Sequence, residues 1–127
     1  MIRTVDPLEF EDLVFDTFEH HGYSARRSRF FCGGEEEISG SVQIHGERHG
    51  IRCKCFEPGE KPVVDSQMLM RTARLLQCNG YAKGILIHTG HPAQATRQTV
   101  PPIAILSADR LPAWLDSQQP PTIPFLP

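Results

Sequence analysis

The stretch from Gly40 to Phe56, "GSVQIHGERHGIRCKCF", holds the residues of this sequence that are best suited to chemistry. It reads as two extended segments around a glycine-containing turn, and the second segment places Lys54 between two cysteines. Thiolates can bind zinc, but no two of the four cysteines have the spacing of a zinc knuckle or a redox dithiol. Cys53 and Cys55 share one face of a strand, and we interpret both as small apolar core residues.

Patterns around this stretch predict one mixed α/β domain. A helix over 6–22 follows from a capping residue, an early proline and a terminal glycine. Its predicted buried stripe is Phe10, Leu13, Val14, Thr17 and Phe18. Strands are predicted over 24–31, 37–45, 50–56, 83–89 and 103–107, and further helices over 63–79, 91–100 and 109–115. The order αβββαβαβ, closing with a short C-terminal helix, predicts a mixed β-sheet flanked by helices.

Length and composition indicate a globular chain with one domain. The chain has 127 residues, of which 39% are hydrophobic and 22% are charged. We expect the domain to span 1–116 and a proline-rich tail or linker to span 117–127. No apolar run approaches the roughly 20 residues of a membrane helix, and no signal-peptide pattern is present, so we expect a cytoplasmic protein without membrane contact.

Charge and histidine placement suggest further contacts. The net charge of -2 does not mark the whole chain as a polyanion binder, but Arg26, Arg27 and Arg29 fall within four positions and permit nucleic-acid contact on one side. The six histidines lack an accompanying set of metal ligands, so we interpret them as surface or turn residues.

Several sequence words, in this order, resemble those of the Mrr-like family of PD-(D/E)XK nucleases, which have the restriction-endonuclease-like fold. The resemblance runs from about Asp6 to Leu115. The words that carry it are "FEDLVFDTFEHHGY", "EISG", "IRCKCF", "YAKGILIHTGHPAQATRQ" and "IAILSADRL". Such nucleases hold Mg²⁺ with carboxylate oxygens and place a lysine near the attacking water. The family takes these groups from "EIDG", from Glu/Gln-x-Lys on the next strand, and from a glutamate on the first helix.

Two of these four family positions are replaced in this chain. Glu11 matches the helix glutamate and Lys54 matches the lysine. Ser39 stands where the aspartate would be, and Arg52 stands at the glutamate or glutamine position. Serine is a poor substitute for the principal metal ligand, and arginine puts a fixed positive charge where a divalent cation would sit.

The resemblance therefore implies a catalytically inactive domain, and we expect it to bind no metal or cofactor. It would act as a DNA-binding or protein-interaction module, with a cleft or tail available to a protein partner. The candidate nucleic-acid residues are Arg26, Arg27, Arg29 and Lys54. A homodimer is an additional expectation, because cutting two strands commonly takes two sites.

Other interpretations remain open. One is an active Mg²⁺-dependent DNA endonuclease in which Glu36 or Glu37 replaces the lost aspartate and works with Glu11 and Lys54. Another is a sensor or interaction domain without nucleic-acid binding. A separate hypothesis pairs Arg52 with Glu11 or Glu37, so that an ion pair replaces the metal bridge.

Overall fold

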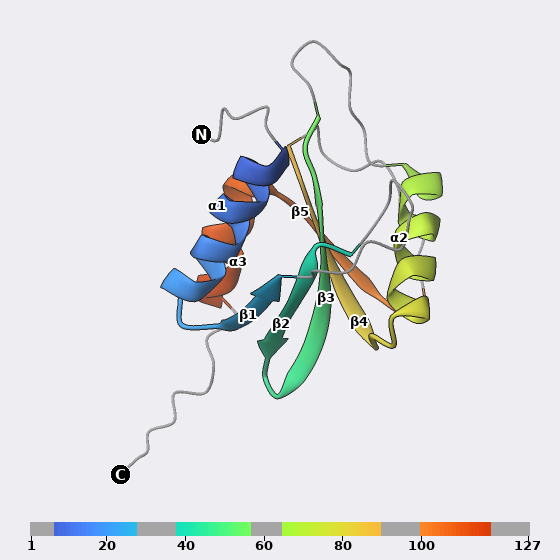
Figure 1. Cartoon of the computed structure of the whole chain (residues 1–127), viewed down its shortest axis with the longest axis horizontal. Helices are drawn as coiled ribbons and strands as arrows, with labels where there is room; N and C mark the ends of the chain where they lie inside the picture. Colours follow the sequence, from blue (N-terminus) through green and yellow to red (C-terminus); the bar gives the residue numbers. More distant parts are fainter. Residues whose placement is uncertain (1–6, 28–37, 57–64, 90–99, 118–127) are drawn as a thin grey trace.

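The computed structural model describes residues 7–27, 38–56, 65–89 and 100–117 of the chain. Its elements form three layers, with a five-stranded sheet between helices on both faces (Figure 1). The helices are α1 (Pro7–His20), α2 (Ser66–Cys78) and α3 (Leu111–Ser117), and a 3-10 turn, η1 (Ala108–Arg110), leads into α3. The strands are β1 (Ser24–Arg27), β2 (Gly40–Ile44), β3 (Glu47–Lys54), β4 (Lys83–His88) and β5 (Ile103–Ser107).

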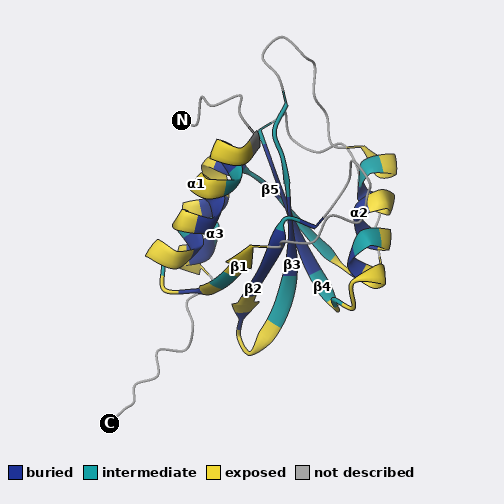
Figure 2. Ribbon diagram, viewed as in Figure 1, coloured by how far each residue is buried: buried dark blue, intermediate teal, exposed yellow. Residues whose placement is uncertain are grey.

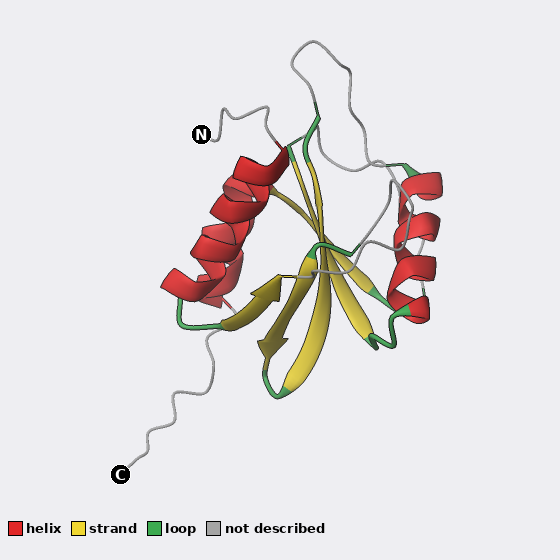
Figure 3. Ribbon diagram, in the orientation of Figure 1, coloured by secondary structure: helices red, strands yellow, loops and turns green. Residues whose placement is uncertain are grey.

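The strands lie in the order β1-β2-β3-β4-β5 and form a mixed sheet. β1, β2 and β3 pair antiparallel, whereas β4 pairs parallel to both β3 and β5. Helices and strands follow one another along the chain as the sequence patterns predict (Figure 3). The α/β class and the mixed sheet flanked by helices are therefore confirmed. The helix predicted over 91–100 falls largely outside the described residues.

The inner face of α1 supplies much of the main hydrophobic core (Figure 2). Phe10, Val14 and Phe18 are buried as predicted, because positions four apart lie on one face of a helix. The prediction for Leu13 is wrong: its side chain is 43% exposed, and Phe15 is buried in its place. Gly40 of β2 leaves room for Phe15, because a Cβ atom there would overlap the Phe15 ring and the Arg26 carbonyl oxygen.

The opposite face of the sheet is covered by α2, which packs closely because two strand positions lack side chains. A Cβ atom on Gly50 or Gly84 would overlap Leu76 of α2. Beside this contact, Leu69 and Leu86 form a second, smaller apolar cluster. Glycine at these two positions therefore sets how near α2 lies to β3 and β4.

The boundaries and burial of two strands differ from the predictions. β3 begins at Glu47, three residues before the predicted start, because the hairpin turn is short. β5 is only half-buried apart from Leu106, since it lies at the edge of the sheet instead of within it. Within the described residues, no helix is long and apolar enough to cross a membrane.

Candidate functional site

Ser39 uses its hydroxyl group to extend the pairing of β2 with β3. Its backbone N–H donates to the carbonyl oxygen of Ile51 at 2.7 Å, just before β2 begins. Its Oγ accepts a hydrogen bond from the backbone N–H of Cys53 at 3.0 Å. The Ser39 side-chain oxygen thus accepts a hydrogen bond of the kind that backbone carbonyl oxygens accept elsewhere in the sheet. Both the backbone N–H and the hydroxyl of Ser39 are thus used in pairing with β3.

Cys53 is a core residue, as predicted. Its side chain and that of Cys55 are partly buried and pack against the main hydrophobic cluster. Burial, followed by the charge of Glu11, raises the pKa of the Cys53 thiol to about 12, although a hydrogen bond with Ser39 acts in the opposite direction. A thiol with so high a pKa holds its proton at neutral pH and is a poor metal ligand or nucleophile.

Glu11 lies on α1 and forms an ion pair with β1. Arg27 Nη2 donates to Glu11 Oε1 at 2.9 Å, while Arg27 Nη1 donates to Asp12. The Arg27 guanidinium also lies 5.5 Å from the centroid of the Phe15 ring. These contacts tie Arg27 to α1 on one side of the sheet.

The predicted nucleic-acid arginines are separated by strand parity. Arg26 neighbours Arg27 on β1 and therefore points to the opposite, α2-facing side, where it is exposed. Arg29 lies outside the described residues. Of the β1 arginines, Arg26 is the one whose side chain is available to a ligand, because two carboxylates already engage Arg27.

Arg52 is buried beneath α2, with only 4% of its surface exposed. Its Nη1 donates to Thr72 Oγ1 at 2.7 Å, and that hydroxyl donates in turn to the carbonyl oxygen of Met68 at 2.8 Å. Glu11 forms its ion pair with Arg27, and Glu37 lies outside the described residues. The pairing of Arg52 with either glutamate stays a hypothesis.

Lys54 ends β3 on the same face as Arg52, two positions along the strand. Its Nζ lies 5.8 Å from the centroid of the Phe56 ring, and it forms no ion pair within the part of the chain that the structure describes. Thr89 holds this end of the strand in place, since its N–H donates to the Lys54 carbonyl at 3.2 Å and its Oγ1 accepts from Phe56 N–H at 2.9 Å. The lysine is therefore presented from a fixed backbone.

His88 lies beside Lys54 in the parallel register of β3 and β4. The interpretation of this histidine as a surface or turn residue is wrong, because its side chain is only 1% exposed. Burial lowers the pKa of its imidazole. His88 ends a central strand that is covered on both faces, which explains its burial.

The four family positions fall into two groups. Arg52 and Lys54 share the α2-facing side of β3. The other two have different partners: Glu11 on α1 pairs with Arg27, and Ser39 accepts a hydrogen bond from the Cys53 N–H. Over residues 7–27, 38–56, 65–89 and 100–117, no three His, Cys, Asp or Glu side chains gather as a metal site requires. Glu36 and Glu37 are not among those residues.

The sequence interpretation missed a third basic residue on this side of β3. Arg48 shares the face of Arg52 and Lys54, and its Nη1 donates to Ser41 Oγ at 2.6 Å. The same parity that relates Arg52 to Lys54 would have found it, had the strand been extended back past Gly50.

The mixed sheet and its flanking helices form a restriction-endonuclease-like fold. A family model described as restriction endonuclease, of the Mrr type, matches residues 2–115. The chain therefore belongs to the Mrr-like restriction endonuclease family. Searches of curated proteins and of solved structures found no match.

Proposed function

We propose that this domain binds DNA and does not cleave it. The observation that carries the proposal is the buried position of Arg52, whose guanidinium donates to Thr72 where the family has a glutamate or glutamine. A guanidinium keeps its charge at any physiological pH, so this group repels a divalent cation under all ordinary conditions.

The described donor set does not fit Mg²⁺, and this supports the loss of cleavage. Mg²⁺ requires hard oxygen ligands, usually one or two carboxylates together with water. Ser39 offers a neutral hydroxyl that already accepts a backbone hydrogen bond, and Glu11 is paired with Arg27. The described residues therefore offer no ligand set for a metal-dependent hydrolytic step.

The retained positive charge supports DNA as the partner. Lys54 lacks an ion-pair partner within the described part of the chain, and Arg26 is exposed on the same side of the sheet. Loss of the acidic ligands removes the repulsion that carboxylates exert on a polyanion when no metal neutralises them. DNA is also the substrate class of the family to which the chain belongs. Such a role fits the expected cytoplasmic location.

The test combines metal titration with assays of DNA binding and cleavage. Mg²⁺ and Mn²⁺ are titrated by calorimetry, and plasmid is incubated with the protein in the same low-salt buffer. A gel shift then compares the unaltered chain with the Lys54→Ala variant. We expect no metal binding, no cleavage, and a DNA shift that weakens in the variant and at higher salt.

Each other result overturns the proposal in a defined way. Chelator-sensitive cleavage that Lys54→Ala abolishes would establish the endonuclease that uses Glu36 or Glu37. Absence of both cleavage and a DNA shift at low salt would leave a sensor or protein-interaction domain. Sedimentation analysis of the same samples tests the expected homodimer.

A further inference from the structure

We propose that Arg26 and Arg48 form a phosphate-binding site for the DNA backbone on the α2-facing side of β1, β2 and β3. The inference rests on the proposed DNA binding and adds a contact surface to it. The site lies near the hairpin end of the sheet, whereas Lys54 lies at the far end of β3. It contains none of the four family positions.

The two arginines approach Ser41 from the strands on either side of it. Arg48 Nη1 donates to Ser41 Oγ at 2.6 Å, and Arg48 Nη2 donates to Gln43 Oε1 at 3.3 Å. Arg26 is the direct partner of Ser41 in the antiparallel register of β1 and β2. Directly opposed residues have their Cβ atoms about 5 Å apart and project to the same face. Both arginines therefore have the buried hydroxyl of Ser41 as a neighbour.

The charges of this pair are not neutralised by the described residues. The other arginine of β1, Arg27, engages two carboxylates, and Lys83 pairs with Glu47 at 3.0 Å. Within the described residues, Arg26 and Arg48 form no such ion pair, and the partners of Arg48 are neutral oxygens. Arg26 on β1 and Arg48 on β3 flank β2, and these two like charges repel each other. An anion held between them would relieve this repulsion.

Arg48 is oriented before any ligand arrives. Its hydrogen bonds to Ser41 and Gln43 use two of the five N–H donors of the guanidinium group. The remaining donors can bind phosphate oxygens, for which the planar fork of arginine is well suited. Because Arg48 is already held, less side-chain entropy is lost when it binds.

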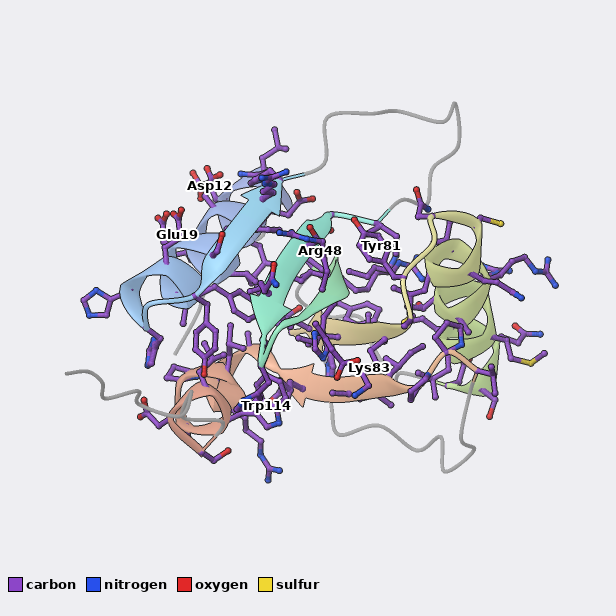
Figure 4. All side chains as sticks on the ribbon, turned by 90° about the horizontal axis from the view of Figure 1, so that it is seen from below. Asp12, Glu19, Arg48, Tyr81, Lys83 and Trp114 are labelled. Atoms are coloured by element: carbon purple, nitrogen blue, oxygen red, sulfur yellow. The ribbon has the colours of Figure 1, made fainter. Side chains whose placement is uncertain are left out.

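On this face Arg26 is exposed and Arg48 is half-buried. The Tyr81 ring packs over Gly50, two positions along β3 from Arg48, and Figure 4 shows the two labelled side chains on this part of the molecule. Arg48 and Lys54 are six positions apart on one strand face, which corresponds to about 20 Å. That length equals roughly six base-pair steps, which is the spacing that a duplex in contact with both residues would have to span.

The experiment measures how salt affects duplex binding by Arg26→Gln, Arg48→Gln and the double variant. The logarithm of the binding constant falls linearly with the logarithm of salt concentration, and each lost phosphate contact reduces that slope by about 1. We expect a reduction of about 1 for each single variant and about 2 for the double variant. Arg110→Gln is the matched control, because Arg110 is exposed on η1, which leads into the helix on the other face.

The outcomes separate this inference from the proposed function. A duplex that binds the double variant with an unchanged slope overturns the Arg26–Arg48 site and leaves DNA binding in place. Equal loss in Arg110→Gln also overturns it, since general charge would then explain the effect. If the unaltered chain binds no duplex at low salt, both proposals fail. Arg26 is exposed, so Arg26→Gln should not disturb the fold, and thermal melts of all variants check this.

Discussion

At the scale of single residues, the proposed loss of metal binding depends on Ser39 and Arg52 together. We expect the double variant Ser39→Asp, Arg52→Gln to bind Mn²⁺ in a calorimetric titration, because it restores the carboxylate and removes the buried cation. The new carboxylate can still accept the Cys53 N–H, and the new amide can still donate to Thr72 Oγ1. Neither exchange therefore needs to disturb the strand.

The two single variants are the controls for that prediction. Ser39→Asp alone keeps the Arg52 charge, and Arg52→Gln alone lacks the ligand, so we expect neither to bind the metal. Mn²⁺ binding by Arg52→Gln alone would show that another acid, such as Glu36 or Glu37, supplies the missing ligand. That result would favour the endonuclease interpretation.

The buried imidazole of His88 predicts how acid affects stability. Burial lowers its pKa in the folded chain from the ordinary value of 6.5, so the unfolded chain binds a proton at a pH where the folded chain does not. The free energy of unfolding should therefore fall as the pH drops from about 7 to about 5. We expect urea titrations of His88→Gln to show a weaker pH dependence over this range.

Sequence patterns identified the residue types at this site but not their partners. Strand parity places Arg52 and Lys54 on one face, and the structure agrees. Parity cannot show that α2 buries Arg52 or that the Ser39 hydroxyl turns to the Cys53 amide, because both depend on contacts between distant segments. The prediction for His88 failed for the same reason, since its burial follows from the position of β4 within the sheet.

At the scale of elements, α2 matters because it covers Arg52 and sets its environment. Asp65 caps this helix, and its side chain accepts a hydrogen bond from Met68 N–H at 2.9 Å. We expect Asp65→Ala to lower the free energy of unfolding by about 1 kcal/mol, because an N-terminal donor of the helix loses its acceptor. Urea titration measures this change.

The matched variant for the cap is Asp65→Asn, which keeps an oxygen acceptor at the same position. We expect its stability to stay within a few tenths of a kcal/mol of the unaltered chain. An equal loss in both variants would mean that the charge of Asp65, and not its capping hydrogen bond, supports the helix.

Element types could be predicted from the sequence more reliably than element environments. The first helix and the core strands have clear periodicity, and the mixed order of helices and strands restricted the fold to a sheet between helices. The half-burial of β5 could not be predicted in this way, because a central and an edge strand can have the same apolar sequence pattern. Strand order decides which it is, and strand order depends on the whole chain.

At the scale of the whole molecule, the first and last described helices depend on each other. α1 and α3 pack together on one face of the sheet (Figure 1). Tyr23, just before β1, donates a hydrogen bond from its hydroxyl to the Leu115 carbonyl oxygen at 3.2 Å. Leu111 and Leu115 are at most 2% exposed and belong to the main core. Residues of the first and the last described helix therefore complete one common hydrophobic core.

Two shortened chains test where the domain ends. A chain ending at Ser117 keeps every contact of α3 described here, so we expect its melting temperature in circular dichroism to match that of the full chain. A chain ending at Arg110 loses both buried leucines. Removing one buried leucine side chain commonly costs about 2–5 kcal/mol, and a small domain has about 5–15 kcal/mol in all. We therefore expect this chain to be largely unfolded at 25 °C. A normal melting transition for it would contradict the role of α3 in the core, whereas destabilisation of the longer chain would assign a structural contact to the predicted tail.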